Sequence, residues 1–443
     1  MVKKRTYRAV EVESFDVQVL IDQFPEGSEV VVGLDVAKRK FLAAFASSGG
    51  DVAEIVRFEH PVNTRVFLDH LRELTTRGRK VVLVLEPTGT YGDAIRYQLD
   101  LMGVPVHRVS TKHVSDCAEL YDRVPSKHDA KDACVIAWLH ATGRSTPWTK
   151  ADELKRRLRA LVSQRDLYDD PLRRLRAQLE PLLARHFPEF ESYFDISRRR
   201  TPLVVLETFP SPADIASAGA QRLGELIGRA SRRPMGEEDA ARFVEAAKRS
   251  LGVPMVEEEK TLIRRLVTEM RRLLDLVREI DGQIAAVGQS DPAIVSMRSV
   301  LGATTAAVIV AHMGSPAGYG SAGAFEKAAG LNLREHSSGT QQGRLRISKR
   351  GPGRVRKYLF LAAMRLTQTD PVVRAWYIRR QAYTEEAKMR ALIAVVRKLA
   401  RALVHVARGA PFDAARLFDV RRLGFDQPSA PPTTTTPTEV SMT

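Results

Sequence analysis

Residues 29–60 read EVVVGLDVAKRKFLAAFASSGGDVAEIVRFEH, and this stretch decides the fold of the N-terminal part of the chain. Three apolar or alternating runs are separated by the short polar segments AKR and SSGGD. Runs of this length that are rich in β-branched and aromatic residues and bounded by turn residues are typical of strands. The pattern therefore predicts a meander of three strands.

Beyond the meander the sequence pattern alternates between helix and strand. Apolar spacing and run length predict, in chain order, a helix over 64–76, a strand over 80–85, a helix over 91–102 and a strand over 104–109. A last helix is expected within SKHDAKDACVIAWLHATGR, residues 126–144. The order βββαβαβα is that of an α/β RNase H-like domain, with expected bounds of 29–145.

Four carboxylates stand where the elements of such a domain meet. In an RNase H-like sheet the first strand lies beside the fourth, and the last helix packs across both. Asp35 ends the first apolar run, Glu86 follows the fourth strand, and Asp129 and Asp132 begin the last helix. Each carboxylate alone is more typical of a turn, a helix cap or a solvated strand end. Together, in this order, the four predict one acidic pocket.

An acidic pocket of this kind needs a partner for its charge. Four carboxylates at close range raise one another's pKa unless cations neutralise them. Ligands that are all oxygen favour Mg²⁺ or Mn²⁺. Two such ions, roughly 3.5–4 Å apart, can stabilise the attacking and leaving oxygens of a phosphodiester. The sequence thus predicts that Asp35, Glu86, Asp129 and Asp132 are metal ligands.

The rest of the chain is basic and mostly helical. The formal charge of +16 and pI near 10 suit a polyanion, and the absence of a bilayer-length apolar run favours nucleic acid over a membrane. Two cysteines and no signal-peptide core predict a cytoplasmic protein without disulfides. We expect an N-terminal extension over 1–28, a helical coiled-coil region over 151–290 with an insert at 201–254, a mostly α domain over 291–424 and a disordered tail over 425–443.

The coiled-coil prediction depends on a heptad seam. Apolar residues recur at alternating four- and three-residue steps, at Leu266, Met270, Leu273, Val277, Ile280, Ile284 and Val287. The segment 153–183 is a plausible antiparallel partner, although Pro171 is expected to break or kink it.

A second motif lies in the C-terminal domain. Between Gly343 and Arg365 there are eight Lys or Arg and no acid, which predicts contact with a nucleic-acid backbone. The residues expected to make it are Arg344, Arg346, Lys349, Arg350, Arg354, Arg356 and Lys357. Ser337 and Ser338 precede this run. Serine needs an activating base or metal, and an ordinary Ser-Ser-Gly turn is the simpler interpretation of the spacing.

Five motifs in fixed order resemble those of a known family. They are LDVAK, LEPTGTY, KHDAKDA, AGLNLREHSSG and RISKRGPGRVRKYL. This set resembles the insertion-sequence transposases that join an N-terminal RuvC-like DEDD domain to a C-terminal serine-bearing transposase domain, the bridge-RNA-guided recombinases. The similarity covers roughly Val30 to Leu139 and Met297 to Asp413.

The resemblance implies specific roles. The DEDD metal ligands would be Asp35, Glu86, Asp129 and Asp132. The nucleophile that forms a phosphoserine link with DNA would be Ser338, or Ser337 if the motif alignment shifts by one residue. It also implies that the protein binds donor DNA, target DNA and a guide RNA. The protein would form a dimer or tetramer joined through the coiled coil, and each active site would be shared between protomers.

Two other functional classes remain open from the residues alone. A RuvC-like metal-dependent junction nuclease would use the same carboxylates to hydrolyse DNA with water and would need no serine. A nucleic-acid-binding protein without catalysis would keep the basic residues and need no carboxylates.

Overall fold

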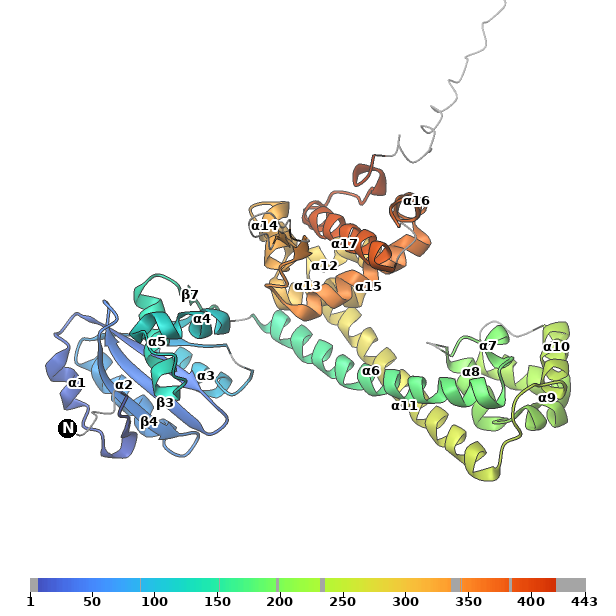
Figure 1. The fold of residues 1–443 in the computed structure, drawn as a ribbon, viewed down its shortest axis with the longest axis horizontal. Coiled ribbons are helices and arrows are strands. Elements are labelled where there is room, and N and C mark those ends of the chain that lie inside the picture. The colour runs from blue at the N-terminus through green and yellow to red at the C-terminus, as the bar shows by residue number, and fades with distance from the viewer. Residues whose placement is uncertain are drawn as a thin grey trace, which may run out of the picture. The chain divides into compact units, whose positions relative to one another are not determined.

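The structure is a computed structural model that describes residues 7–87, 89–150, 152–196, 199–231, 236–335, 343, 345–381 and 385–419. The chain divides into two compact units, Met1–Lys150 and Ala151–Thr443. The first is a mixed α/β unit and the second is mostly helical (Figure 1). In the described part of the chain, no helix is both long and apolar enough to cross a bilayer.

The first unit is built on one mixed sheet. Its strands are β1 (Val10–Glu11), β2 (Glu29–Val36), β3 (Lys40–Ser47), β4 (Val52–Glu59), β5 (Lys80–Leu85), β6 (Val106–Arg108) and β7 (Thr146–Pro147). Within the described residues their order is β1-β4-β3-β2-β5-β6-β7. The meander β2–β3–β4 is antiparallel, and β2 pairs in parallel with β5. The five central strands have the order of an RNase H-like sheet.

Helices cover both faces of this sheet. They are α1 (Gln18–Gln23), α2 (Thr64–Thr76), α3 (Asp93–Leu101), α4 (Thr111–Asp122) and α5 (Asp129–Ala141). Alternate residues of each strand point to opposite faces. Val30, Val32 and Leu34 of β2 therefore join the core that contains residues of α1, α2 and α3. Val31 lies in the core on the α4 and α5 side.

Residues 7–28, which belong to the segment that the sequence predicts as an extension, contribute to this unit. β1 pairs in parallel with β4, and Val12, Phe15, Leu20 and Phe24 are buried in the core shared with α2. The helix α4 is not among the predicted elements and covers part of the α5 side of the sheet.

The second unit has two hydrophobic cores joined by two long helices. These helices are α6 (Glu153–His186) and α11 (Glu257–Gly288), which lie side by side (Figure 1). The start of α6 packs in one core with the end of α11, and the end of α6 packs in the other core with the start of α11. The pair is therefore antiparallel. The helix α6 is not broken at Pro171.

The heptad seam of α11 is buried inside the unit. Of the seam residues named above, all but the partly buried Val287 are buried. The core at the far end of the pair is completed by α7 (Phe190–Tyr193), α8 (Arg200–Thr208), α9 (Pro212–Ala230) and α10 (Glu237–Lys248). The segment 201–254 therefore contributes to a core that it shares with α6 and α11.

The other core holds the C-terminal helices. They are α12 (Pro292–Leu301), α13 (Ala303–Met313), α14 (Ala322–Ala328), α15 (Gly353–Thr369), α16 (Pro371–Arg380) and α17 (Glu385–Ala407). A two-stranded hairpin of β8 (Leu333–Arg334) and β9 (Arg346–Ile347) lies between α14 and α15 in the sequence. The predicted tail, 425–443, lies outside the described residues.

Candidate active site

Asp35 and Glu86 lie at the carboxyl ends of two neighbouring parallel strands. Leu34 of β2 pairs with Leu85 of β5, so the next residue of each strand brings the two carboxylates to the same edge of the sheet. By strand alternation, Asp35 shares its face with Val31, and Glu86 shares its face with Val84. That face is the one that α4 and α5 cover.

A glycine in β2 brings α5 close to these strands. A Cβ atom at Gly33 would lie 2.2 Å from the backbone oxygen of Ala133 and 2.6 Å from the backbone nitrogen of Ala137. A side chain at this position would therefore clash with the helix backbone. The absence of a side chain allows α5 to pack directly on β2, two residues before Asp35.

The first turn of α5 is fixed by two further contacts. The imidazole of His128 accepts a hydrogen bond from the backbone N–H of Ala130 (3.1 Å), which caps the helix. Lys131 is fully buried, and its ammonium pairs with Asp122 of α4 (2.7 Å) and donates to the backbone oxygen of Val124 (2.6 Å). These contacts hold the turn that carries Asp129 and Asp132.

The predicted carboxylates influence one another. Burial, followed by the charges of Asp132, Asp129 and Glu86, raises the pKa of Asp35 from 3.8 to about 7. The pKa of Asp132 is also raised, first by burial and then by Asp129. Residues far apart in the sequence thus form one acidic cluster. Within it Asp129 is exposed and Asp132 half-buried. Spacing of three, four and seven residues puts Asp129 on one helix face with Asp132, Ala133 and Ile136, which predicts an inward Asp129, but only Ala133 and Ile136 are buried.

The acidic cluster suits a divalent cation in charge and in donor type. All four side chains offer carboxylate oxygens, which are the ligands that Mg²⁺ and Mn²⁺ prefer. A cation would also relieve the repulsion that raises the pKa of Asp35. Among the described residues, however, no three Asp, Glu, His or Cys side chains are already arranged to coordinate one ion.

The two candidate nucleophiles, Ser337 and Ser338, lie outside the described residues, as does Arg344. The remaining residues of the predicted basic set fall into two groups. Arg346, Lys349 and Arg350 are exposed on β9 and the turn that follows it. Arg354, Arg356 and Lys357 lie in the first turns of α15 and contact other parts of the second unit.

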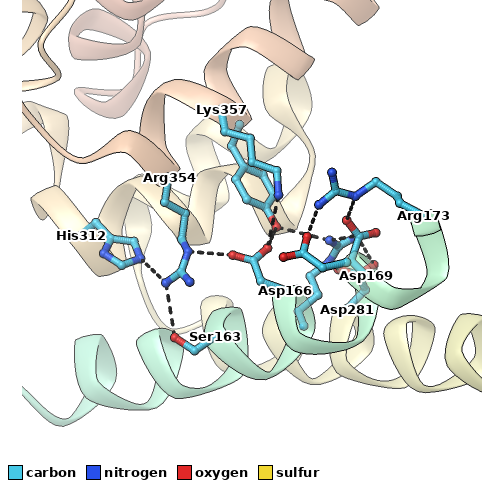
Figure 2. A network of polar contacts seen from close by, with 11 residues as sticks. Ser163, Asp166, Asp169, Arg173, Asp281, His312, Arg354 and Lys357 are labelled. Atoms are coloured by element: carbon cyan, nitrogen blue, oxygen red, sulfur yellow. Dashed lines mark hydrogen bonds and ion pairs between the residues drawn. The ribbon is translucent and has the colours of Figure 1, made fainter. Parts of the chain in front are cut away.

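Arg354 and Lys357 belong to a polar network that the sequence does not predict (Figure 2). Asp166 of α6 pairs with Arg354 (Nε to Oδ2, 2.7 Å) and with Lys357 (3.8 Å). Arg354 also lies 3.3 Å from the hydroxyl of Ser163 and 3.4 Å from Nε2 of His312. Burial, with the charge of Arg354 next, lowers the pKa of His312 to about 4.

The network continues to α11 and fixes α6 against the C-terminal core. Arg165 donates to Asp281 (2.7 Å), which also accepts from Thr304 (2.7 Å). Tyr358 donates its hydroxyl to Asp166 (3.1 Å). The signal in the sequence was the acidic group at Asp166, Asp169 and Asp170 inside an otherwise basic helix.

Comparisons with known proteins find two family models that match successive parts of this chain. A family model for the DEDD transposase domain of IS110, described as "Transposase", matches residues 32–188. A second, described as "Transposase IS116/IS110/IS902 family", matches residues 294–378. The first match contains all four carboxylates, and the second contains the serine pair and the basic run.

Curated relatives come from insertion elements. The "Insertion element IS116 uncharacterized 44.8 kDa protein" of Streptomyces clavuligerus is 27% identical over 363 residues, which cover 79% of this chain and 88% of that protein. The "Insertion element IS110 uncharacterized 43.6 kDa protein" of Streptomyces coelicolor is 27% identical over 314 residues, or 68% of this chain and 75% of that protein. With both family models matched in order along one sequence, the chain belongs to the IS110/IS116 family of transposases.

Proposed function

We propose that this transposase cleaves and rejoins DNA by a metal-dependent reaction in which Asp35, Glu86, Asp129 and Asp132 are the DEDD ligands of Mg²⁺ or Mn²⁺. The observation that carries the proposal is the packing of β2, β5 and α5, which brings carboxylates from three separate parts of the sequence near one another, so that Asp132, Asp129 and Glu86 help to raise the pKa of Asp35 to about 7. Such strong perturbation in a group of convergent carboxylates is typical of a functional site.

The bound ions would supply Lewis-acid stabilisation of charge on the reacting phosphate. The protein's own part is to hold the carboxylates together on a rigid framework of β2, β5 and α5. Without a cation, Asp35 keeps a proton up to about pH 7. Cation binding therefore competes with that proton, and the affinity for Mg²⁺ should rise with pH through this range.

We assign Ser338 as the nucleophile, with Ser337 as the alternative register. Its oxygen would bond to phosphorus as the bond from phosphorus to one DNA oxygen breaks, so that the phosphodiester energy is kept for rejoining. The motif match around AGLNLREHSSG supports this assignment. A guide RNA is part of the proposal on the same ground, and the basic composition of the chain is compatible with it.

Association into a dimer or tetramer is also proposed. Because the seam of α11 is buried against the chain's own helices, a second copy that associates through the α6–α11 pair would contact the outward faces of these helices.

The test is a DNA cleavage assay with labelled element ends, analysed on a denaturing gel. We expect wild-type protein with Mg²⁺ to form a covalent protein–DNA adduct and EDTA to abolish it. Ser338→Ala should lose the adduct and Ser337→Ala should keep it, while Ser296→Ala in α12 serves as the control. Asp129→Asn should lose cleavage but retain DNA binding.

Other outcomes separate the alternatives. Cleavage by Ser338→Ala and by the Ser337/Ser338 double variant without any adduct would mean hydrolysis by water, as in a junction nuclease. Full cleavage by Asp129→Asn in EDTA would refute the metal assignment.

A further inference from the structure

A pocket of about 670 Å³ lies at the base of the β8–β9 hairpin. Its lining includes Lys327, Asn332, Arg334, Glu335, Ser348 and Arg350. These residues come from three places: the end of α14, the strand β8 with its approach, and the turn after β9. Arg334 ends β8, and the segment with Ser337 and Ser338 follows only three residues later in the sequence.

Tight backbone packing forms one side of the pocket. A Cβ atom at Gly351 would lie 2.3 Å from the backbone oxygen of Ala328, and one at Gly330 would lie 2.8 Å from the backbone nitrogen of Arg350. The backbone N–H of Ser348 donates to the oxygen of Asn332 (2.8 Å). The turn after β9 is thus held directly against the turn after α14.

Three cations in this lining have no acidic partner among the residues that the structure describes. Lys327, Arg334 and Arg350 are all exposed, and none forms an ion pair with another residue in the described part of the chain. The neighbouring Glu326 is different, because it is buried and pairs with Arg397 and Arg401 of α17. With Glu335 as the acid of the lining, positive charge is in excess.

Asn332 adds a neutral donor to these cations. Its side-chain oxygen accepts a hydrogen bond from the hydroxyl of Ser348 (2.6 Å). This bond orients the amide and leaves its NH₂ group to donate to a ligand. Cations together with an amide donor are the groups that bind the phosphate and sugar oxygens of nucleic acids.

We infer that this pocket binds one nucleotide of a single nucleic-acid strand through a phosphate that is not cleaved. Lys327, Arg334 and Arg350 neutralise the phosphate, and Asn332 donates to it or to the sugar. The volume suits a nucleotide and lies in the range of ordinary ligand pockets, whereas a duplex does not fit a space of this size. The inference rests on the proposed function, because its role is to hold the strand beside the segment that carries Ser338.

The test is binding of fluorescent 12-nucleotide single strands, one of DNA and one of RNA, measured by anisotropy in EDTA over a series of salt concentrations. We expect the full-chain variant K327Q/R350Q to bind one or both strands about tenfold more weakly at low salt. Its log–log salt slope should fall by about 0.7, the value for one phosphate of a single strand. Arg334→Gln should change binding in the same direction. Arg265→Gln, an exposed cation of α11, is the matched control and should bind as wild type does.

The strand that loses affinity identifies the ligand as DNA or RNA. Wild-type affinity and slope for both strands in K327Q/R350Q and in Arg334→Gln would overturn the inference. Because binding is measured without metal or cleavage, this result is independent of the proposed chemistry. Failure of the proposed function would appear instead as unchanged cleavage in Asp129→Asn.

Discussion

Replacement of Asp35 by Asn should stabilise the metal-free α/β unit at neutral and alkaline pH. The carboxyl has a pKa of about 7 in the folded protein and an ordinary value of 3.8. Between these values the folded state holds a proton that the unfolded state has lost. The free energy of unfolding therefore falls as the pH rises from about 4 to about 7, and the loss is complete above that range.

The size of the effect follows from the pKa difference. At about 1.4 kcal/mol for each pKa unit, a rise from 3.8 to about 7 is equivalent to about 4 kcal/mol. Asn carries no charge and has nearly the same shape. We expect Asp35→Asn to recover about 2–4 kcal/mol at pH 8 and little at pH 4, which is close to the ordinary pKa, so that the carboxyl is protonated in the folded state and still partly protonated in the unfolded state.

The assay is hydrogen exchange of the full chain, followed by mass spectrometry on peptides that cover β2 and β3. Protection in these strands reports the stability of the first unit separately from the second. In EDTA at pH 8, Asp35→Asn should exchange more slowly than wild type. Addition of Mg²⁺ should slow exchange in wild type and change the variant less, because the cation neutralises a cluster that the variant has already weakened.

The control is Glu29→Gln, which removes a carboxylate from the same strand and face at the opposite end of β2. It should respond to Mg²⁺ as wild type does. Equal protection of Asp35→Asn and wild type in EDTA at pH 8, together with no effect of Mg²⁺ on wild type, would refute the idea that these carboxylates repel one another within one cluster.

Three further predictions concern packing and the polar network. Gly33→Ala should destabilise the first unit by about 1–3 kcal/mol or more, because the new Cβ meets the backbone of α5, and thermal melting followed by circular dichroism should show the loss. Asp166→Asn should destabilise the second unit by about 1.5–3 kcal/mol in urea titrations, because Arg354 loses a charged hydrogen-bond partner. Acidification from pH 7 to pH 4.5 should destabilise wild type, since His312 resists protonation when folded, and His312→Gln should flatten this dependence in pH-resolved melts.

Each of these predictions has a matched comparison. Gly224→Ala in α9, where an added Cβ meets nothing within 4 Å, should be neutral or slightly stabilising. Asp170→Asn, on an exposed part of α6, should cost less than Asp166→Asn. Equal melting of Gly33→Ala and wild type would contradict the close approach of α5, and an unchanged acid profile in His312→Gln would contradict the burial of that imidazole.

Local patterns predicted the central elements of the α/β unit because those elements have strong signals. The helix at Thr64–Thr76 and the strand at Lys80–Leu85 have the bounds that periodicity gave. The sequence did not reveal β1 and β7, because each is a two-residue edge strand that exists only through pairing with its neighbour. It also did not give α4, in which Val114 is the buried side chain.

The approach of Asp35 to Glu86 was predictable from the order of the strands, but the contacts that support the acidic cluster were not. Asp35 and Glu86 follow from two apolar runs that become neighbours in the sheet. The role of Gly33 and the buried pair of Lys131 with Asp122 depend on the distance between α5 and its surroundings, which no local pattern encodes. The assignments of Ser338 and of the guide RNA stay predictions.

The basic run shows another limit of sequence reading. Arg354 and Lys357 looked equivalent to Arg350, yet α15 turns them toward Asp166 of α6 while Arg350 stays exposed. Charge density in a sequence does not distinguish a cation that binds a ligand from one that holds two helices together.

The antiparallel pair of α6 and α11 restricts how relatives of this protein can differ in size. Both helices are shared between two cores, so the apolar residues at their far end are covered by α8, α9 and α10. Removal of those three helices alone would expose these apolar residues of α6 and α11 to water. A shorter α6–α11 pair therefore requires matched deletions, with the same number of turns removed from the end of α6 and from the start of α11. The length of the pair should vary among relatives in such paired steps.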